Sequence, residues 1–491
     1  MSEHRIFFKR IASIGVVKIF TSFRGLIILP LLTKTLGVAY YGVWAQILIT
    51  IGLLTPLLTL NLATPMVRFL AAEKDTKKTA QGIFTVIFTV LAAAGFFSLI
   101  LFLFSDSTAL LLLQDRSYAP FIQLAAAVLI FEVVSQISMD SFRIFGQITT
   151  YSFLSIFQTI LEVSLIMAAI FLGWGLPGAL LALLITRAAV SGIALVYIFW
   201  HTGFALPRLS ILKPYLAFAL PLLPLGLFDI LINSGDRFVI GFFKGAVAVG
   251  VYSATYSIGF LTVIFIFPIA YILSPTIFKL FDEGQIEKVT MYLSYSLKYF
   301  LVFAIPSVFG LTVLAKTLLR TLATSEFVAF NSMIIVLMIA LGALLYGVQA
   351  VYGQVIMLKK KTSFFILAFG IGVLSNMVLN VILIPYWGPL AAAASTLVAY
   401  LLVAALIIGK SRQYVRFEFN TVFVAKSIFA SCLMALAIAT FNPIGSIQIL
   451  LAVGGGALVY FSLLLFSRAF SSQEIAFFSS ALHIRHIFEI L

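Results

Sequence analysis

Four polar side chains interrupt the long apolar run of residues 221–257. Asp229, Asn233, Asp236 and Arg237 are spaced i, i+4, i+7 and i+8, so a helix places them along one face. A charged side chain at the centre of a bilayer costs roughly 2.5–3.5 kcal/mol on insertion scales. We therefore expect this face to line a bundle interior or a wet cavity on a path through a membrane.

Basic side chains also lie within apolar runs. Arg24 falls near the middle of the first run, and Lys18 lies six residues earlier, roughly 120° away around a helix. Arg24 is too deep to reach the headgroups easily, which favours a cavity-facing role over a purely structural ion pair. Lys18 either extends to the inner headgroups or faces the cavity. Lys298, about two turns into a later run, either extends to the surface or lines a basic vestibule.

Glu162 and Arg187 belong to two consecutive apolar runs that turn near Trp174. They lie 12 and 13 positions from the turn, so they have matching depth on adjacent helices and are able to form an internal pair. A structural pair is the favoured interpretation, with a substrate or proton role as the alternative. Glu132 is a further deep acid, and a protonatable glutamate in a dry bundle is a candidate for ion coupling.

The composition is that of a membrane protein with many spans. Of the 491 residues, 62% are hydrophobic and 10% are charged, and the mean hydropathy is +1.16. Soluble domains carry about 25% charged residues. We identify fourteen apolar runs of about 20 residues as spans. Their approximate limits are 11–33, 41–63, 82–104, 118–139, 148–172, 176–199, 215–241, 249–273, 291–313, 329–352, 363–384, 390–409, 423–441 and 445–467.

The net charge of +14 reflects membrane orientation rather than nucleic-acid binding, because the basic residues are scattered through short loops. With the N-terminus inside, most of these residues fall on the inner side, and both termini are cytoplasmic. The outer loops then hold Lys34, Arg116, Lys244, Lys316 and Arg320.

The sequence contains no motif for binding a metal or a cofactor or for nucleophilic catalysis. The sequence has one cysteine, and its four histidines fall in loops or termini. It contains no GxxxxGK[ST] phosphate loop and no nucleophile elbow. We therefore expect no cofactor, no metal and no enzymatic activity.

A weak internal repeat relates the two halves of the chain. Gly37 and Gly42 correspond to Gly245 and Gly250 at an offset of 208 residues, and 175–179 resembles 388–392. Each offset spans six helices, an even number, so the repeats are parallel. We predict an N-terminal lobe, an inner linker, a C-terminal lobe and a pair of additional helices with an inner tail. Their limits are 1–200, 201–214, 215–410 and 411–491.

Four segments together resemble polysaccharide biosynthesis flippases of the Wzx type, within the multidrug/oligosaccharidyl-lipid/polysaccharide (MOP) exporter superfamily. They are residues 221–257, 376–400, 24–46 and 60–73. The resemblance implies an all-α integral membrane fold of about 14 spans, with two six-helix lobes around a central cavity and two extra helices. It also implies alternating access, which would move a polyprenyl-diphosphate-linked oligosaccharide across the plasma (inner) membrane for surface polysaccharides such as O-antigen or lipopolysaccharide.

A diphosphate needs Arg or Lys inside a low-dielectric protein, and Arg24 is the best-placed candidate. The implied partners are the lipid-linked oligosaccharide, membrane lipids, and polymerase and chain-length proteins, with no nucleic acid. A MATE-like antiporter for drugs or organic cations is the alternative, and it would need an acidic cavity. A membrane glycosyltransferase or ligase is a third class, which the short outer loops disfavour.

Overall fold

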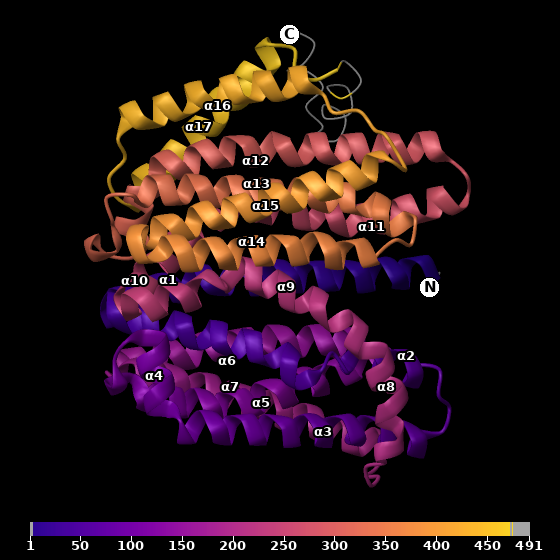
Figure 1. Ribbon diagram of the computed structural model, residues 1–491. Coiled ribbons are helices and arrows are strands. Elements are labelled where there is room, and N and C mark those ends of the chain that lie inside the picture. The colour runs from indigo at the N-terminus through magenta and orange to yellow at the C-terminus, as the bar shows by residue number, and fades with distance from the viewer. Residues whose placement is uncertain (1–2, 472–473, 475–491) are drawn as a thin grey trace. The chain divides into compact units, whose positions relative to one another are not determined.

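The computed structural model describes residues 3–471 and residue 474, and for residues 3–23 and 26 it describes the backbone alone. Every regular element in this range is a helix (Figure 1). Twelve helical stretches of these residues are long and apolar enough to cross a membrane. The stretch Leu209–Asp282 contains two of the predicted spans, and the stretch Ile27–Thr59 overlaps two others, so the predicted count of fourteen and the twelve stretches describe the same helices.

The links expected between these paired spans are kinks and not loops. α1 (Glu3–Thr59) contains the predicted span 11–33 and all but the last four residues of the predicted span 41–63, and its only non-helical residue is Gly37, with φ 77° and ψ 175°. α10 (Asp236–Phe260) has the same kind of break at Gly245, with φ 73° and ψ −174°. This conformation is essentially restricted to glycine. The two kinks coincide with the predicted repeat positions.

The chain divides into two compact units, which we describe separately. Unit 1 comprises residues 1–254, 322–329 and 363–399, and unit 2 comprises residues 255–321, 330–362 and 400–491. Both units combine segments from distant parts of the sequence. The lobe limits drawn from the sequence stay a prediction.

In unit 1, α5 packs against both α3 and α7, and α6 packs against α1 and α7 (Figure 1). Asp75 caps the start of α3 by accepting hydrogen bonds from the backbone amides of Lys77 and Lys78. The remaining helices of the unit are α2, α4, α8, α9, part of α10, α14 and part of α15. The bounds are α2 (Ala63–Leu70), α3 (Thr76–Leu103), α4 (Ser105–Leu113), α5 (Ala119–Ile144), α6 (Ile148–Phe171), α7 (Gly175–Thr202), α8 (Leu212–Ala219), α9 (Leu223–Ser234), α14 (Ser363–Trp387) and α15 (Pro389–Arg412).

The predicted span 215–241 is made of several short pieces. Pro221 lies in a 3₁₀ turn and Pro224 in the first turn of α9, where a proline without an amide hydrogen is tolerated. α8 ends before this turn. Gly235 keeps a right-handed helical conformation between α9 and α10, so the polar stripe found in the sequence continues from one helix to the next.

α1 and α10 cross at two glycines that the repeat relates. A Cβ atom on Gly42 would lie 1.9 Å from the carbonyl oxygen of Ala246, and one on Gly250 would lie 2.3 Å from that of Val38. Val38 and Ala246 are themselves 208 residues apart, so the contact is reciprocal. Only glycine at both positions permits this approach of the two backbones.

Within the described residues, unit 2 contains the end of α10, part of α15 and five further α-helices. α16 and α17 form a hairpin, whose turn begins at Asn442 in the left-handed region and ends at Gly445 (Figure 1). Tyr460 of α17 ties this hairpin to α12 through its hydroxyl, which donates to the carbonyl of Val302 at 2.9 Å. The bounds are α11 (Ile266–Asp282), α12 (Ile286–Leu322), α13 (Ser332–Leu358), α16 (Thr421–Phe441) and α17 (Ser446–Phe466).

Candidate functional site

Four charged side chains from four helices of unit 1 form a continuous ion network, which we call the Arg24 network. Arg187 of α7 bonds Glu132 of α5 through Nε, and its Nη1 lies 3.0 Å from Oε2 of Glu162 in α6. Arg24 of α1 places its own Nη1 2.9 Å from the same glutamate oxygen. Two positive and two negative charges balance, so the network is neutral as a whole.

A tight turn positions the centre of this network. Gly173 and Gly175 both have positive φ and turn the chain between α6 and α7. The two helices then run side by side from this turn, which brings Glu162 and Arg187 to equal depth. Glu162 and Arg187, whose matching depth the sequence indicated, thus form an ion pair in the structure. Glu132 and Arg24 extend this pair into a network.

The members of the network differ in exposure. The side chains of Glu162 and Arg187 are 3% and 8% exposed, whereas those of Glu132 and Arg24 are 27% and 37% exposed. Arg187 is a buried cation held by two carboxylates. Arg24 presents a planar fork of five N–H donors, of which the described side chains use one. Such a fork matches the geometry of phosphate or carboxylate oxygens.

A second polar cluster surrounds Asp236, which is fully buried at the start of α10. Its carboxylate pairs with Nη1 of Arg237 at 3.0 Å and accepts hydrogen bonds from the hydroxyls of Tyr252 and Thr396. The guanidinium of Arg237 also lies over the Tyr252 ring, 5.2 Å from its centroid. α10 supplies Tyr252 from beyond its kink at Gly245, and α15 supplies Thr396.

The Asp236 cluster continues into α14. Asn376 donates to the hydroxyl of Thr396 at 3.3 Å, and Asn380 donates to the side-chain oxygen of Asn376 at 2.9 Å. Ser395 completes the chain by bonding Asn380. All of these side chains are buried, so the bonds satisfy groups that would otherwise be costly in an apolar interior.

The polar stripe of the sequence joins this cluster. Asn233 donates to the backbone and side-chain oxygens of Asp229 at 2.8 and 3.2 Å, and Arg237 donates to the backbone oxygen of Asn233 at 2.8 Å. The spacing of i, i+4 and i+8 therefore does place these residues along one face. Asp229 and Asn233 are only partly buried, whereas Asp236 and Arg237 are buried.

Lys298 lies in unit 2 and has an acidic partner. Its ammonium group lies 2.7 and 2.8 Å from the two carboxylate oxygens of Glu474, and over the rings of Phe423 and Phe470. Burial raises the pKa of Glu474, but hydrogen bonds from Lys298 and from the Ser471 backbone outweigh it and hold that pKa below its ordinary value. Glu474 is therefore charged at neutral pH.

The sequence reasoning missed four groups that complete these clusters. Tyr252, Ser395 and Thr396 are not distinguishable from packing residues in the sequence, and Glu474 falls in the tail after the last span, where no periodicity points to it. The side chain of Lys18 lies outside the described residues. Among the described residues, no group of three or more His, Cys, Asp or Glu side chains is arranged to hold a metal ion.

Known structures share the architecture that carries these clusters. Lipid II flippase MurJ in an inward closed conformation superposes with a TM-score of 0.77 at 17% identity, over 92% of this chain and 98% of that chain. An inward-facing multidrug resistance MATE family transporter of the MOP superfamily gives a TM-score of 0.61 at 15% identity, over 81% and 97%. At such identities the likeness establishes the fold alone: a multi-pass, all-helical membrane protein of the MurJ/MATE type.

A sequence comparison goes further. A family model described as polysaccharide biosynthesis protein matches residues 7–281, more than half of the chain. The chain belongs to this family. A curated relative from Haloferax volcanii, named "Probable low-salt glycan biosynthesis flippase Agl15", is 24% identical over 229 residues. The alignment covers 46% of this chain and 48% of that relative, so the chain spans about half the length of the curated relative.

Proposed function

We propose that this protein is a flippase that moves a polyprenyl-diphosphate-linked oligosaccharide across the plasma membrane for surface polysaccharide biosynthesis, by alternating access. The observation that carries the proposal is the Arg24 side chain, which is 37% exposed within an apolar helix of a member of the polysaccharide biosynthesis family. The relative named a glycan biosynthesis flippase supports the same class of substrate, and the fold shared with the flippase MurJ is compatible with it.

The charge balance of the Arg24 network explains how an exposed cation is kept ready in an apolar protein. An isolated charge at this depth would be costly. Glu162 lowers that cost by pairing with Arg24 and is itself held by Arg187, which is buried. The diphosphate would therefore meet a guanidinium that one ion pair already holds in place and whose other donors the described side chains do not use.

The competing function is a MATE-like antiporter for organic cations, and one observation favours it. Glu132 is 27% exposed, so the same network also presents a carboxylate. The two functions make opposite demands on the network. A diphosphate flippase needs Arg24 and tolerates a neutral Glu132, whereas a cation antiporter needs Glu132.

The test is export of surface polysaccharide in a host in which this chain is the only flippase. Arg24→Ala is expected to abolish export at a normal protein level, and Arg24→Lys is expected to retain part of it, because Lys keeps the charge but not the fork. Arg143→Ala is the matched control. Arg143 is 56% exposed and pairs only with Asp140 on its own helix among the described residues.

Wild-type export by Arg24→Ala would overturn the phosphate-binding role. The cation antiporter is favoured instead if the wild type restores no export in this host but confers efflux of an organic cation, and if Glu132→Gln loses that efflux while Arg24→Ala keeps it. The cytoplasmic position of both termini and an interaction with polymerase and chain-length proteins belong to the same proposal. Cysteine labelling of loops on the two sides tests the orientation. Co-purification from a host that expresses this protein with the polymerase and the chain-length protein tests the interaction.

A further inference from the structure

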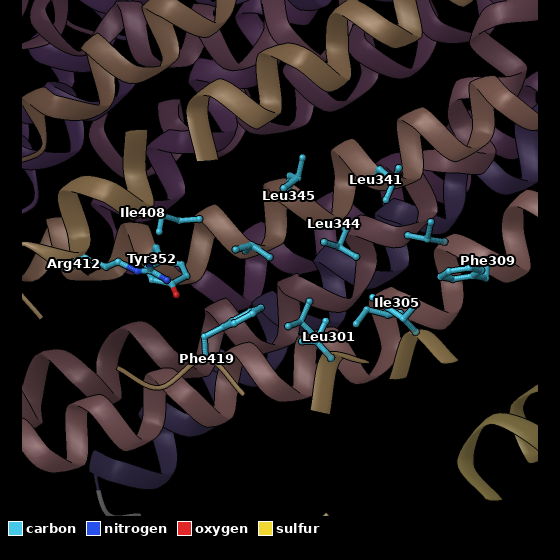
Figure 2. A pocket seen from close by; sticks show the side chains of 14 residues that line it. Leu301, Ile305, Phe309, Leu341, Leu344, Leu345, Tyr352, Ile408, Arg412 and Phe419 are labelled. Atoms are coloured by element: carbon cyan, nitrogen blue, oxygen red, sulfur yellow. The ribbon is translucent and has the colours of Figure 1, made fainter. Parts of the chain in front are cut away.

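An apolar groove runs between α12, α13, α15 and α16 in unit 2, and we call it the C-terminal groove. Its volume is about 430 Å³, within the range of about 300–1,000 Å³ that small-molecule sites occupy. Figure 2 shows leucine, isoleucine and phenylalanine side chains along its length. Leu301, Ile305 and Val348 form a buried floor, while Phe419 and Ile428 are exposed at its rim.

One end of the groove is cationic. Arg412, in the last turn of α15, lies at this end next to Tyr352 (Figure 2). It is exposed, and no acidic side chain in the described part of the chain pairs with it. The positive-inside pattern predicts that this end of α15 faces the cytoplasm. A ligand for the groove therefore combines an apolar chain with an anionic head at the inner membrane surface.

The adjoining polar pocket explains why the anion belongs at Arg412 and not at Lys298. This second cavity, of about 210 Å³, shares Leu301 and Phe419 with the groove. Its cation is Lys298, but Glu474 neutralises that charge with two short contacts, and Glu418 also lines the pocket. Two carboxylates and one ammonium group repel a phosphate. Of the two cations, Lys298 and Arg412, only Arg412 is free, within the described residues, of carboxylates that would repel an anion.

We propose that the C-terminal groove binds one anionic phospholipid of the inner leaflet, with an acyl chain along the groove and its phosphate at Arg412. Basic pockets between membrane helices on the cytoplasmic side are a recognised type of anionic lipid site. The apolar floor supplies affinity through burial of the chain, and Arg412 supplies the preference for a negative headgroup. This site is separate from the Arg24 network and from the transported substrate.

The test is native mass spectrometry of the full-length protein in detergent, titrated with phosphatidylglycerol or with phosphatidylcholine of the same chains. The wild type is expected to retain one phosphatidylglycerol in preference to phosphatidylcholine. Arg412→Ala is expected to lower that preference about fivefold, the order of effect of one basic side chain near an anionic surface. Arg416→Ala, an exposed arginine that does not line the groove, is the matched control.

A second pair of variants tests the apolar part of the site. Leu344→Trp fills the groove and is expected to remove retention of both lipids, whereas Leu401→Trp, at an exposed position outside the groove, is expected to bind like the wild type. An unchanged preference in Arg412→Ala overturns the headgroup assignment even if Leu344→Trp fails to fold. Displacement of phosphatidylglycerol by an equimolar polyprenyl phosphate also overturns the proposal, because the groove would then belong to the carrier lipid.

Discussion

At the scale of single residues, exposure separates two arginines that share one glutamate. Arg187 is buried between Glu132 and Glu162, while Arg24 reaches the same Glu162 with a side chain that is 37% exposed. The buried arginine compensates two carboxylates and thereby holds α5, α6 and α7 together. The exposed arginine has donors available for a ligand. Mutations at the two positions should therefore have different consequences.

Arg187→Met is expected to lower the thermal stability of the purified protein, because it leaves two carboxylates without their shared cation. Breaking a buried pair by removing one partner typically costs about 3–5 kcal/mol. Thermal unfolding followed by size-exclusion chromatography in detergent measures the effect. Arg143→Met, which breaks an exposed pair, serves as the control. Equal melting temperatures for the two variants would mean that the network does not stabilise the fold.

The sequence predicted an ion pair between helices only where a short turn fixes the relative depth of residues on the two helices. The short turn at Trp174 sets the depth of Glu162 and Arg187 on neighbouring helices, so counting residues was sufficient. Arg24 and Glu162 are 138 residues apart, and their contact depends on how α1 rotates against α6. That rotation is set by packing along the whole helix and not by any local spacing.

At the scale of elements, glycine determines where helices bend and where they touch. Gly37 and Gly245 interrupt α1 and α10 with nearly identical dihedral angles. The hydropathy pattern placed spans on both sides of each glycine but predicted loops between them. A single residue in a glycine-only conformation changes the helix direction while the flanking residues stay helical, so composition alone does not distinguish this kink from a loop.

Gly42→Ala is expected to destabilise the crossing of α1 and α10, since the added Cβ would meet a backbone oxygen that has no rotamer to change. Overpacking of a tight contact costs typically about 1–3 kcal/mol. Gly250→Ala should have a similar effect for the reciprocal reason. Gly52→Ala, also in α1 but with nothing within 4 Å of the new Cβ, is the control. It should be neutral or stabilise by up to about 1 kcal/mol through helix propensity.

Melting temperatures of the three variants, measured in one detergent, test whether the tight crossing stabilises the fold. A Gly42→Ala protein as stable as Gly52→Ala would show that the two helices separate at no cost, and the tight crossing would then not be a fixed part of the fold.

At the scale of the whole molecule, the asymmetry of Lys and Arg predicts the orientation. The run Lys359–Lys361 between α13 and α14 is expected inside, and the short turn around Tyr386 between α14 and α15 is expected outside. The all-helical class and the family follow from composition and from the family match. The arrangement of the polar clusters required coordinates, because it depends on contacts between distant helices.

Cysteine labelling tests the orientation with little background, because Cys432 is the only native cysteine. In a Cys432→Ser protein, Lys360→Cys should react with a membrane-impermeant maleimide only after the cells are opened. Tyr386→Cys, whose parent side chain is 81% exposed, should react in intact cells. The opposite pattern would invert the orientation and place Arg412 at the outer surface.

The reciprocal glycine contact constrains how this sequence is able to diverge. When two side chains collide, a smaller neighbour can restore the fit, but at Gly42 and Gly250 each obstacle is a main-chain carbonyl oxygen. No change of side chain elsewhere shrinks a carbonyl group, so no compensating mutation is available at either position. Besides the two kinks at Gly37 and Gly245, this crossing is therefore a place where both repeats must keep glycine while the rest of their sequences drift apart.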